Sequence, residues 1–284
     1  MDSQTILTGL FGHPVGHSLS PLMHNRAFEA CGLNYRYAAF DIDPSRVQEA
    51  VQAVRALGMR GVNVTIPYKV TVMDYLDEVD EEAKIIGAVN TIVNEGGKLV
   101  GYNTDGRGYV RSLTEETGID LASQSAVLLG AGGAARGVAI ALLKAGLPSL
   151  VIANRTVEKA EQLAAHMKQA VPQATVCALP LNKVAEALAT STLLIQTTSI
   201  GMHPKTEASP LPAETLHGGL TVSDLIYNPM ETRLLRDAKA KGARVHCGVG
   251  MFIYQGALSF EYWTGRPAPV NVMREVVMDA LRGQ

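Results

Sequence analysis

The sequence predicts a two-lobed α/β protein, and three observations support this fold class. Short apolar runs alternate with amphipathic stretches along most of the chain, which is typical of α/β proteins. A glycine-rich turn near residue 130 follows an apolar run and opens a helical stretch, as in the doubly wound parallel sheet of a Rossmann-type domain. The 284 residues are enough for about two domains of roughly 150 residues each.

The first part of the chain is predicted to form one α/β lobe. Its predicted strands are residues 5–12, 35–42, 61–67, 88–94 and 98–103, and its predicted helices are residues 22–32, 44–58 and 106–118. Glu95-Gly96-Gly97 separates the last two strands and predicts a hairpin. In the strand 61–67, apolar residues alternate with Asn63 and Thr65, so we expect one apolar face and one polar face that points into a cleft.

The second part of the chain predicts a parallel sheet covered by helices. Its predicted strands are residues 125–130, 149–155, 174–180, 192–198, 221–229 and 243–248. Helices are predicted after the glycine-rich turn, over residues 156–170, between residues 180 and 192, and over residues 251–263 and 270–283. This alternation is typical of successive βαβ units.

The composition excludes several classes of protein. Hydrophobic residues make up 47% and charged residues 18% of the chain, whereas a disordered chain has low hydrophobicity and high net charge. The net charge of −2 leaves no cationic excess that would bind nucleic acid or an anionic membrane. Because no run of about 18 apolar residues occurs, we expect no membrane-spanning helix.

The cysteines predict a reducing compartment. Cys31, Cys177 and Cys247 are odd in number, widely spaced and form no CxxC pair, so they imply neither a disulfide framework nor a zinc site. The first residues lack the pattern of a signal peptide. We therefore expect a cytoplasmic protein.

Three histidines near the amino end, His13, His17 and His24, are not expected to bind a metal. Pro14 and Gly16 keep the first two off a common helix face, and no cluster of Asp, Glu or Cys joins them.

The glycine-rich turn predicts a dinucleotide site. Residues 130–135, GAGGAA, match the G-x-G-x-x-A pattern between a strand and a helix. Gly130 permits the tight turn, Gly132 lets the backbone approach a pyrophosphate, and Ala135 allows close packing of helix on strand. The free N–H groups of the helix would face the phosphates. The alternative is a tight turn without a ligand.

The end of the next predicted strand favours NADP over NAD. An NAD enzyme usually carries Asp or Glu there, where it binds the ribose 2′-hydroxyl. This chain has Asn154-Arg155-Thr156, followed by Lys159, and these cations suit a 2′-phosphate. A methyltransferase also uses a glycine-rich turn followed by a carboxylate that binds a ribose, so the missing acid counts against that class of enzyme as well. The alternative is that Arg155 and Lys159 only decorate a helix start.

Polar residues of the first lobe suggest a substrate site. Ser18 and Ser20 could aim two hydroxyls at a carboxylate, or Ser20 could cap a helix that has Pro21 at its first position. Lys69 follows a predicted strand and begins a predicted helix, where it could act as a general base or be a solvated surface lysine. Asn90 could be a turn residue, and Asp105 a helix cap.

Several motifs in the chain carry a resemblance to one family. The motifs are HSLSP (17–21), NVTIPYK (63–69), GAVNT (87–91), NTDGRG (103–108), GAGGAAR (130–136), NRT (154–156), TTSIGM (197–202) and the segment from Gly248 to Gln255. In this combination and order the chain resembles the shikimate dehydrogenases of the aromatic amino-acid pathway. Two positions depart from the pattern, since Lys159 replaces an Arg found in some members and Ile200 replaces a small residue.

The resemblance implies roles for these residues. It implies that Ser18 and Ser20 hold the carboxylate of shikimate, and that Lys69 and Asp105 are the catalytic pair. The other implied substrate residues are Thr65, Asn90, Tyr227 and Gln255. The implied NADP-binding residues are Gly130, Ala131, Gly132, Gly133, Ala134, Asn154, Arg155, Thr156, Lys159, Thr198, Leu225, Gly248 and Met251.

The family also implies the reaction and the domain organisation. The expected reaction is the reversible NADPH-dependent reduction of 3-dehydroshikimate to shikimate, without a metal. Residues 1–110 and 248–284 would form a discontinuous substrate-binding domain, and residues 111–247 the NADP-binding Rossmann domain. We expect a monomer or a homodimer. The alternatives are an NAD-preferring quinate/shikimate dehydrogenase and a non-catalytic NADP-binding regulatory module.

Overall fold

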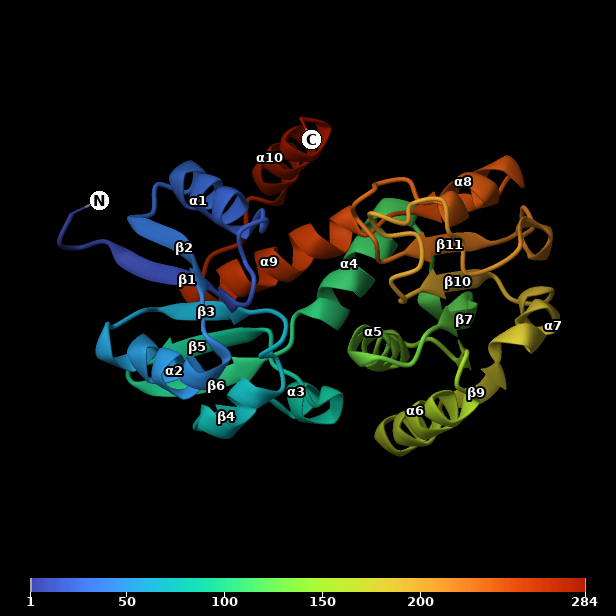
Figure 1. Cartoon of the computed structure of the whole chain (residues 1–284), viewed down its shortest axis with the longest axis horizontal. Coiled ribbons are helices and arrows are strands. Elements are labelled where there is room, and N and C mark those ends of the chain that lie inside the picture. The colour runs from blue at the N-terminus through green and yellow to red at the C-terminus, as the bar shows by residue number, and fades with distance from the viewer. Residues whose placement is uncertain (1, 284) are drawn as a thin grey trace. The chain divides into compact units, whose positions relative to one another are not determined.

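The computed structural model describes residues 2–283, which form two compact units. The first unit contains the residues up to Thr104 and those from Ile253 onward, and the second is Asp105–Phe252. The chain therefore leaves the first unit at the start of one helix and returns to it inside another. Both units are sheets covered by helices (Figure 1), which confirms the predicted α/β fold class.

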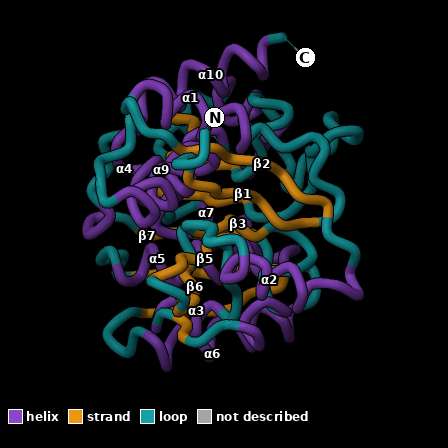
Figure 2. Tube along the Cα trace, turned by 90° about the vertical axis from the view of Figure 1, so that its left-hand side faces the viewer, coloured by secondary structure: helices purple, strands orange, loops and turns teal. Residues whose placement is uncertain are grey.

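The sheet of the first unit has six strands of mixed direction. In spatial order the strands are β2 (Tyr35–Asp41), β1 (Ile6–Gly12), β3 (Gly61–Val64), β5 (Thr91–Glu95), β6 (Lys98–Tyr102) and β4 (Glu78–Val79). The strand β1 pairs in parallel with both β2 and β3, and Figure 2 shows these three side by side. The strands β5 and β6 form the predicted antiparallel hairpin.

The two faces of this sheet are covered by different helices. Val62 and Val64 of β3 pack with α2 (Val47–Ala56) in one apolar cluster. The intervening Asn63 points the other way and donates to Ser259 of α9 (Val249–Thr264). The remaining helices of this unit are α1 (Ser20–Ala30), α3 (Glu81–Ile86) and α10 (Val270–Arg282).

The sheet of the second unit is entirely parallel. Its spatial order is β12 (Arg244–His246), β11 (Thr221–Asp224), β10 (Leu193–Gln196), β7 (Ser125–Leu129), β8 (Ser149–Asn154) and β9 (Thr175–Pro180). The order runs outward in both directions from β7 and β10, which confirms the doubly wound Rossmann-type arrangement. Its helices are α4 (Asp105–Thr117), α5 (Gly133–Lys144), α6 (Val157–Ala170), α7 (Val184–Leu188) and α8 (Arg233–Ala240).

Some local expectations were wrong. The strand predicted to reach residue 67 ends at Val64, because Pro67 offers no N–H and Tyr68 N donates to Thr65 O (3.0 Å) in a turn. Ile66 is therefore 69% exposed instead of lying on the apolar face. No α-helix begins at Lys69, and a 3₁₀ helix spans Thr71–Tyr75. The elements β4, α3 and α8 were not predicted.

The core of the first unit contains a fully buried histidine. His24 of α1 stacks on Tyr37, with 4.5 Å between the ring centroids, and also packs against Trp263 and Phe28. Within the described residues neither ring nitrogen has a hydrogen-bond partner. Burial therefore lowers the pKa of His24 to about 3, because no nearby acceptor stabilises the charged ring.

This histidine makes a pH-dependent contribution to stability. Below about pH 6.5 the unfolded chain protonates His24, whereas the folded chain does not until about pH 3. As the pH is lowered through this range, the free energy of unfolding of the wild type should therefore fall, relative to that of His24→Phe, by about 1.4 kcal/mol for each pH unit. Urea unfolding of both proteins at about pH 7, 5.5 and 4.5 measures the difference, and a difference independent of pH would contradict the prediction.

Candidate active site

One edge of the first unit's sheet brings three predicted site residues together. Thr65 and Lys69 follow the carboxyl end of β3, and Asn90 directly precedes the antiparallel β5. Two backbone hydrogen bonds join these segments, from Val64 N to Asn90 O (2.8 Å) and from Val89 N to Lys69 O (2.7 Å). Lys69 is half-buried, so it is not the fully solvated surface lysine of the alternative interpretation.

The side chain of Asn90 is buried and connects this edge to Thr104, the last residue before the chain leaves the first unit. Its Oδ1 accepts from Thr104 N (2.8 Å), and its Nδ2 donates to Thr104 Oγ1 (2.9 Å). The hydroxyl of Thr104 also donates to Gln255 O (3.0 Å) on α9. The backbone of Gln255, another predicted substrate residue, therefore belongs to the same hydrogen-bond network as Asn90.

Below this edge, Asn63 forms the centre of a buried hydrogen-bond network. Its Nδ2 lies 2.9 Å from Ser259 Oγ, 3.1 Å from Thr91 Oγ1 and 3.2 Å from Asn90 O. Its Oδ1 accepts from Tyr37 OH (2.9 Å). Asn63 therefore supports the site from within the protein, and the expectation that it points into a cleft is wrong.

The two predicted carboxylate-binding serines stand where α1 begins. Ser18 Oγ accepts from Ser20 N (3.2 Å), and Ser20 itself is buried. The helix has Leu19 at its N-cap, so Ser20 and Pro21 are its first two residues. The alternative in which Ser20 caps the helix is wrong, because Leu19 is the N-cap and no side-chain hydrogen bond caps the helix.

The predicted cofactor residues follow the strands of the second unit at one edge of its sheet. Because all six strands are parallel, their carboxyl ends share that edge, where ligands of such sheets bind. Predicted site residues follow five of these strands: Gly130 after β7, Arg155 after β8, Thr198 after β10, Leu225 after β11 and Gly248 after β12.

The glycine-rich turn has the geometry of an anion cradle. Gly130 has φ +110° and its N–H donates to Ala153 O (2.9 Å), which fixes the turn against β8. Gly132 and Gly133 are exposed, and a Cβ added to either would meet nothing within 4 Å. The helix α5 has no side-chain hydrogen bond at its N-cap, Gly132. Backbone N–H groups at a helix start are thus open to a phosphate, and the turn fits a dinucleotide.

The segment after β8 presents cations to solvent. Asn154 Nδ2 donates to Thr156 O (2.8 Å) and so fixes the turn that carries Arg155. Arg155 and Lys159 are both exposed, and α6 begins directly after Thr156. An arginine that is accessible at this position can pair with a 2′-phosphate.

Two buried side chains hold the loops that leave β10 and β11. Gln196 and Asp224 are the paired last residues of these neighbouring strands, and both are fully buried. Gln196 Oε1 accepts from Thr198 N (2.9 Å) and its Nε2 donates to Ile200 O (3.0 Å). Asp224 accepts from Ile226 N (3.0 Å) and from Thr232 Oγ1 (2.8 Å). Burial raises the pKa of Asp224 to about 6.

The loop after β11 is also held from β12. Gly248 N donates to Ile226 O (3.1 Å), and a Cβ on Gly248 would overlap the carbonyl of Leu225. Tyr227 stacks on Phe252, with 5.5 Å between the ring centroids. The loop that carries Leu225 and Tyr227 is therefore held by Gly248 and Phe252, and Met251 is half-buried.

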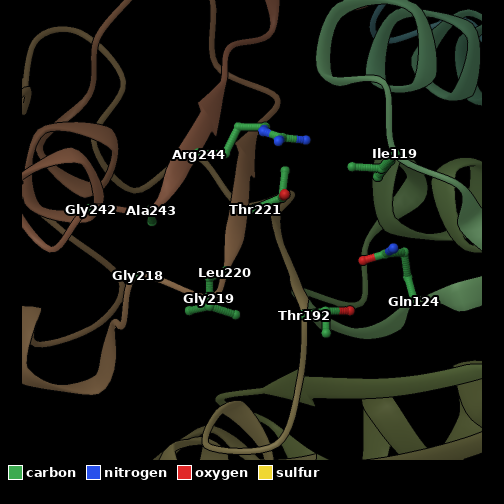
Figure 3. Close-up of a pocket in the computed structure, with 10 residues that line it drawn as sticks. All are labelled: Ile119, Gln124, Thr192, Gly218, Gly219, Leu220, Thr221, Gly242, Ala243 and Arg244. Carbon is green, nitrogen blue, oxygen red and sulfur yellow. The ribbon is translucent and has the colours of Figure 1, made fainter.

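A hollow elsewhere in the second unit lies at the opposite edge of the sheet. It measures about 620 Å³, and its lining includes Gln124, Thr192, Thr221 and Arg244, which stand at the amino ends of strands. Figure 3 shows these side chains around it. The hollow is therefore separate from the edge that carries the glycine-rich turn.

The described residues contain no group of three His, Cys, Asp or Glu side chains placed to hold a metal ion. None of the helices within residues 2–283 combines the length and the apolar character needed to cross a bilayer.

Comparison with known proteins identifies the family. Models of three domains match this chain: the shikimate dehydrogenase substrate binding domain at residues 10–92, shikimate/quinate 5-dehydrogenase at 112–206, and the shikimate 5'-dehydrogenase C-terminal domain at 248–278. The NADP(+) shikimate dehydrogenase of Geobacillus kaustophilus is 52% identical over 96% of this chain and 98% of its own length. That of Methanopyrus kandleri is 50% identical over 99% and 98%.

This chain belongs to the family of NADP-dependent shikimate dehydrogenases. A solved relative, the shikimate dehydrogenase of Thermus thermophilus in complex with NADP(H) and shikimate, has a TM-score of 0.88 and 41% identity, and the match covers 98% of this chain and 100% of that one. The family resemblance drawn from the sequence motifs is thereby confirmed, and with it the class of oxidoreductase.

Several residues that shape this dehydrogenase were not found by sequence reasoning. They are Tyr37, Thr91, Thr104, Gln196, Asp224 and Ser259. All contact predicted site residues or the loops that carry them. Gln196 had a signal in the sequence, since it is the polar last residue of an otherwise apolar strand, whereas Asp224 ends a strand that also contains Thr221 and Ser223.

A pair of glycine substitutions tests whether the turn at residue 130 holds the cofactor. Gly130 and Gly146 both have positive φ, +110° and +99°, so Ala at either position should destabilise the fold by about 1–2 kcal/mol. A Cβ on Gly130 would also lie 2.6 Å from Thr197 Oγ1, whereas on Gly146 it would meet nothing.

Only Gly130→Ala should therefore weaken the binding of NADP+, by at least about tenfold, or about 1.4 kcal/mol. Melting temperatures and a fluorescence titration with the nucleotide measure both effects. Equal affinities of the two variants for NADP+ would contradict this role of the turn.

Proposed function

We propose that this chain performs the family reaction, the reversible NADPH-dependent reduction of 3-dehydroshikimate to shikimate, with Lys69 as its acid–base residue. The observation that carries the proposal is the polar edge of the first unit's sheet. There, backbone hydrogen bonds join the half-buried Lys69 to the segment that carries the buried Asn90. A lysine held in this way can exchange a proton with a bound hydroxyl or carbonyl.

The substrate residues divide by chemistry. Shikimate is a carboxylate with ring hydroxyls, and the hydroxyls of Ser18 and Ser20 at the start of α1 suit the carboxylate. The ring hydroxyls would be bound by side chains that can donate and accept hydrogen bonds. We assign this role to Thr65, Lys69, Asn90, Asp105, Tyr227 and Gln255. Asp105 and Tyr227 belong to the second unit and the other residues to the first unit, which we assign as the substrate-binding domain.

The cofactor residues are those at the carboxyl edge of the second unit. The pyrophosphate would lie on the turn of Gly130, Ala131, Gly132, Gly133 and Ala134, and the 2′-phosphate on Asn154, Arg155, Thr156 and Lys159. Thr198, Leu225, Gly248 and Met251 would line the nicotinamide. When bound, NADPH supplies the hydrogen and the electron pair that the carbonyl carbon gains.

Lys69 moves the proton of the reaction. In reduction, its ammonium group donates a proton to the oxygen that becomes the C3 hydroxyl, and in oxidation its amine accepts that proton. Asp105 is proposed as the carboxylate that orients the lysine and the hydroxyl. General acid–base action of this kind contributes about 10²–10⁴-fold to the rate.

The alternatives are less well supported. An NAD-preferring quinate/shikimate dehydrogenase is disfavoured by Arg155 and by relatives that are named NADP(+) enzymes. A non-catalytic binding module would not need Lys69 and Asp105. Absorbance of the reduced nicotinamide, followed with shikimate or quinate and with NADP+ or NAD+, distinguishes the three functions. No signal from any pair would favour the binding module.

We also propose that the protein works in the cytoplasm, as a monomer or a homodimer. The free state of Cys31, Cys177 and Cys247 supports a reducing compartment.

The role of Lys69 predicts a specific kinetic defect. Lys69→Ala should lower kcat by at least about 10²-fold with little change in KM for shikimate, because it removes a group that acts in the transition state. The matched control is Lys84→Ala, an exposed lysine on α3, which should retain the wild-type kcat. Steady-state kinetics with NADP+ measure both variants, and a near-normal kcat for Lys69→Ala would exclude this role.

The 2′-phosphate assignment predicts a change in cofactor preference. Arg155→Ala removes a positive charge that can pair with the 2′-phosphate of NADP+, a group that NAD+ lacks. KM for NADP+ should therefore rise by about tenfold or more while KM for NAD+ changes little. Lys168→Ala, an exposed cation further along α6, should leave both values unchanged. Equal increases for both nucleotides with Arg155→Ala would show that the arginine does not read the 2′-phosphate.

A further inference from the structure

The helix that begins with Asp105 packs unusually closely on the helix that begins at the glycine-rich turn. Gly106, the second residue of α4, faces α5. A Cβ added to Gly106 would overlap the carbonyl oxygen of Gly137 and lie 2.8 Å from Ala141 Cβ. The backbones of the two helices can approach this closely only because residue 106 has no side chain.

This contact lies next to two parts of the proposed site. On α4 the contact is made by Gly106, which directly follows Asp105 in the chain. On α5 it lies about one turn beyond Gly133, the first residue of the helix. The separation between Asp105 and the start of α5 is therefore set by backbone against backbone, with no flexible side chain between them.

The rest of α4 is fixed to the sheet. Tyr109 OH donates to Ser223 Oγ (2.9 Å), and Ser112 Oγ lies 2.8 Å from His246 Nε2. A hydrogen bond of 2.9 Å between Ser223 and His246 Nδ1 closes this buried chain between β11 and β12. Since these bonds hold the middle of α4, a side chain at Gly106 would displace mainly the amino end, where Asp105 lies.

We propose that Gly106 is a positioning residue for the reduction, because its missing side chain sets the distance between the Asp105 carboxylate and the cofactor-binding start of α5. The proposal rests on the proposed function, in which Asp105 acts in catalysis. It assigns no chemistry to Gly106 itself, which acts only through Asp105.

The first test compares Ala at the two glycines of this contact. Gly106→Ala should lower kcat at saturating substrates by about 10- to 100-fold, since a displacement of about 1 Å can reduce a rate by about 10²-fold. Its Kd for NADP+ should stay within about threefold of the wild type, because the glycine-rich turn is unchanged. The control Gly137→Ala places its Cβ in open space, so it should keep the wild-type kcat.

The second test asks whether Gly106 acts through Asp105. In a double-mutant cycle, Gly106→Ala should reduce kcat further by less than about twofold when Asp105→Asn is already present. A helix packing defect that does not act through Asp105 would instead lower kcat by the same factor in the wild-type and the Asp105→Asn backgrounds. Equal factors in the two backgrounds, or a wild-type kcat in Gly106→Ala, would overturn the proposal.

A milder variant covers the case in which Gly106→Ala does not fold. Ala141→Ser enlarges the opposite side of the same contact, and it should lower kcat by about two- to fivefold with NADP+ affinity retained. An unchanged kcat in Ala141→Ser would then overturn the proposal. Wild-type protein that fails to oxidise shikimate with NADP+ would refute the proposed function itself, whereas active wild-type protein with active variants refutes only the role of Gly106.

Discussion

The side-chain amide of Asn63 connects the elements on which the proposed substrate residues stand. It bonds to Tyr37 of β2, to Thr91 of β5 and to Ser259 of α9, while the backbone of Tyr37 bonds to the side chain of Asn25 of α1. The amide is 5% exposed, so each partner it lost would leave a buried polar group unsatisfied, at about 1–3 kcal/mol. The network therefore fixes α1, the sheet edge and α9 relative to one another within the first unit.

The second unit depends on a different constraint. Its strands are all parallel, so the loops that leave them emerge at one edge regardless of their sequence. Gln196 and Asp224 then hold two of these loops with their own side chains. Asp224 is fully buried and accepts hydrogen bonds from Ile226 N and Thr232 Oγ1. Its raised pKa is consistent with hydrogen bonds that only partly replace water.

Much of this organisation could be predicted from the sequence. Periodicity predicted most strands, and the glycine-rich turn and its following strand predicted the Rossmann-type sheet. The motifs predicted which residues gather at its carboxyl edge. Periodicity could not show that Asn63 supports the site from inside, because an alternating polar residue can face a cleft or another helix. It also missed the short β4 and α3, whose few residues give too little pattern, and it extended β3 through a turn.

The chain passes between its two units beside residues of the proposed site. It leaves the first unit after Thr104 and returns to it at Ile253. Thr104 is held by Asn90 and by the backbone of Gln255, and the next residue is Asp105, at the amino end of α4. The contact of Gly106 on Gly137 then fixes that end of α4 within the second unit. Within the second unit, Asp105 therefore stands at a fixed end of α4. Such a position suits a carboxylate that must orient a proton-transferring lysine, because catalysis requires that orientation before the reaction begins.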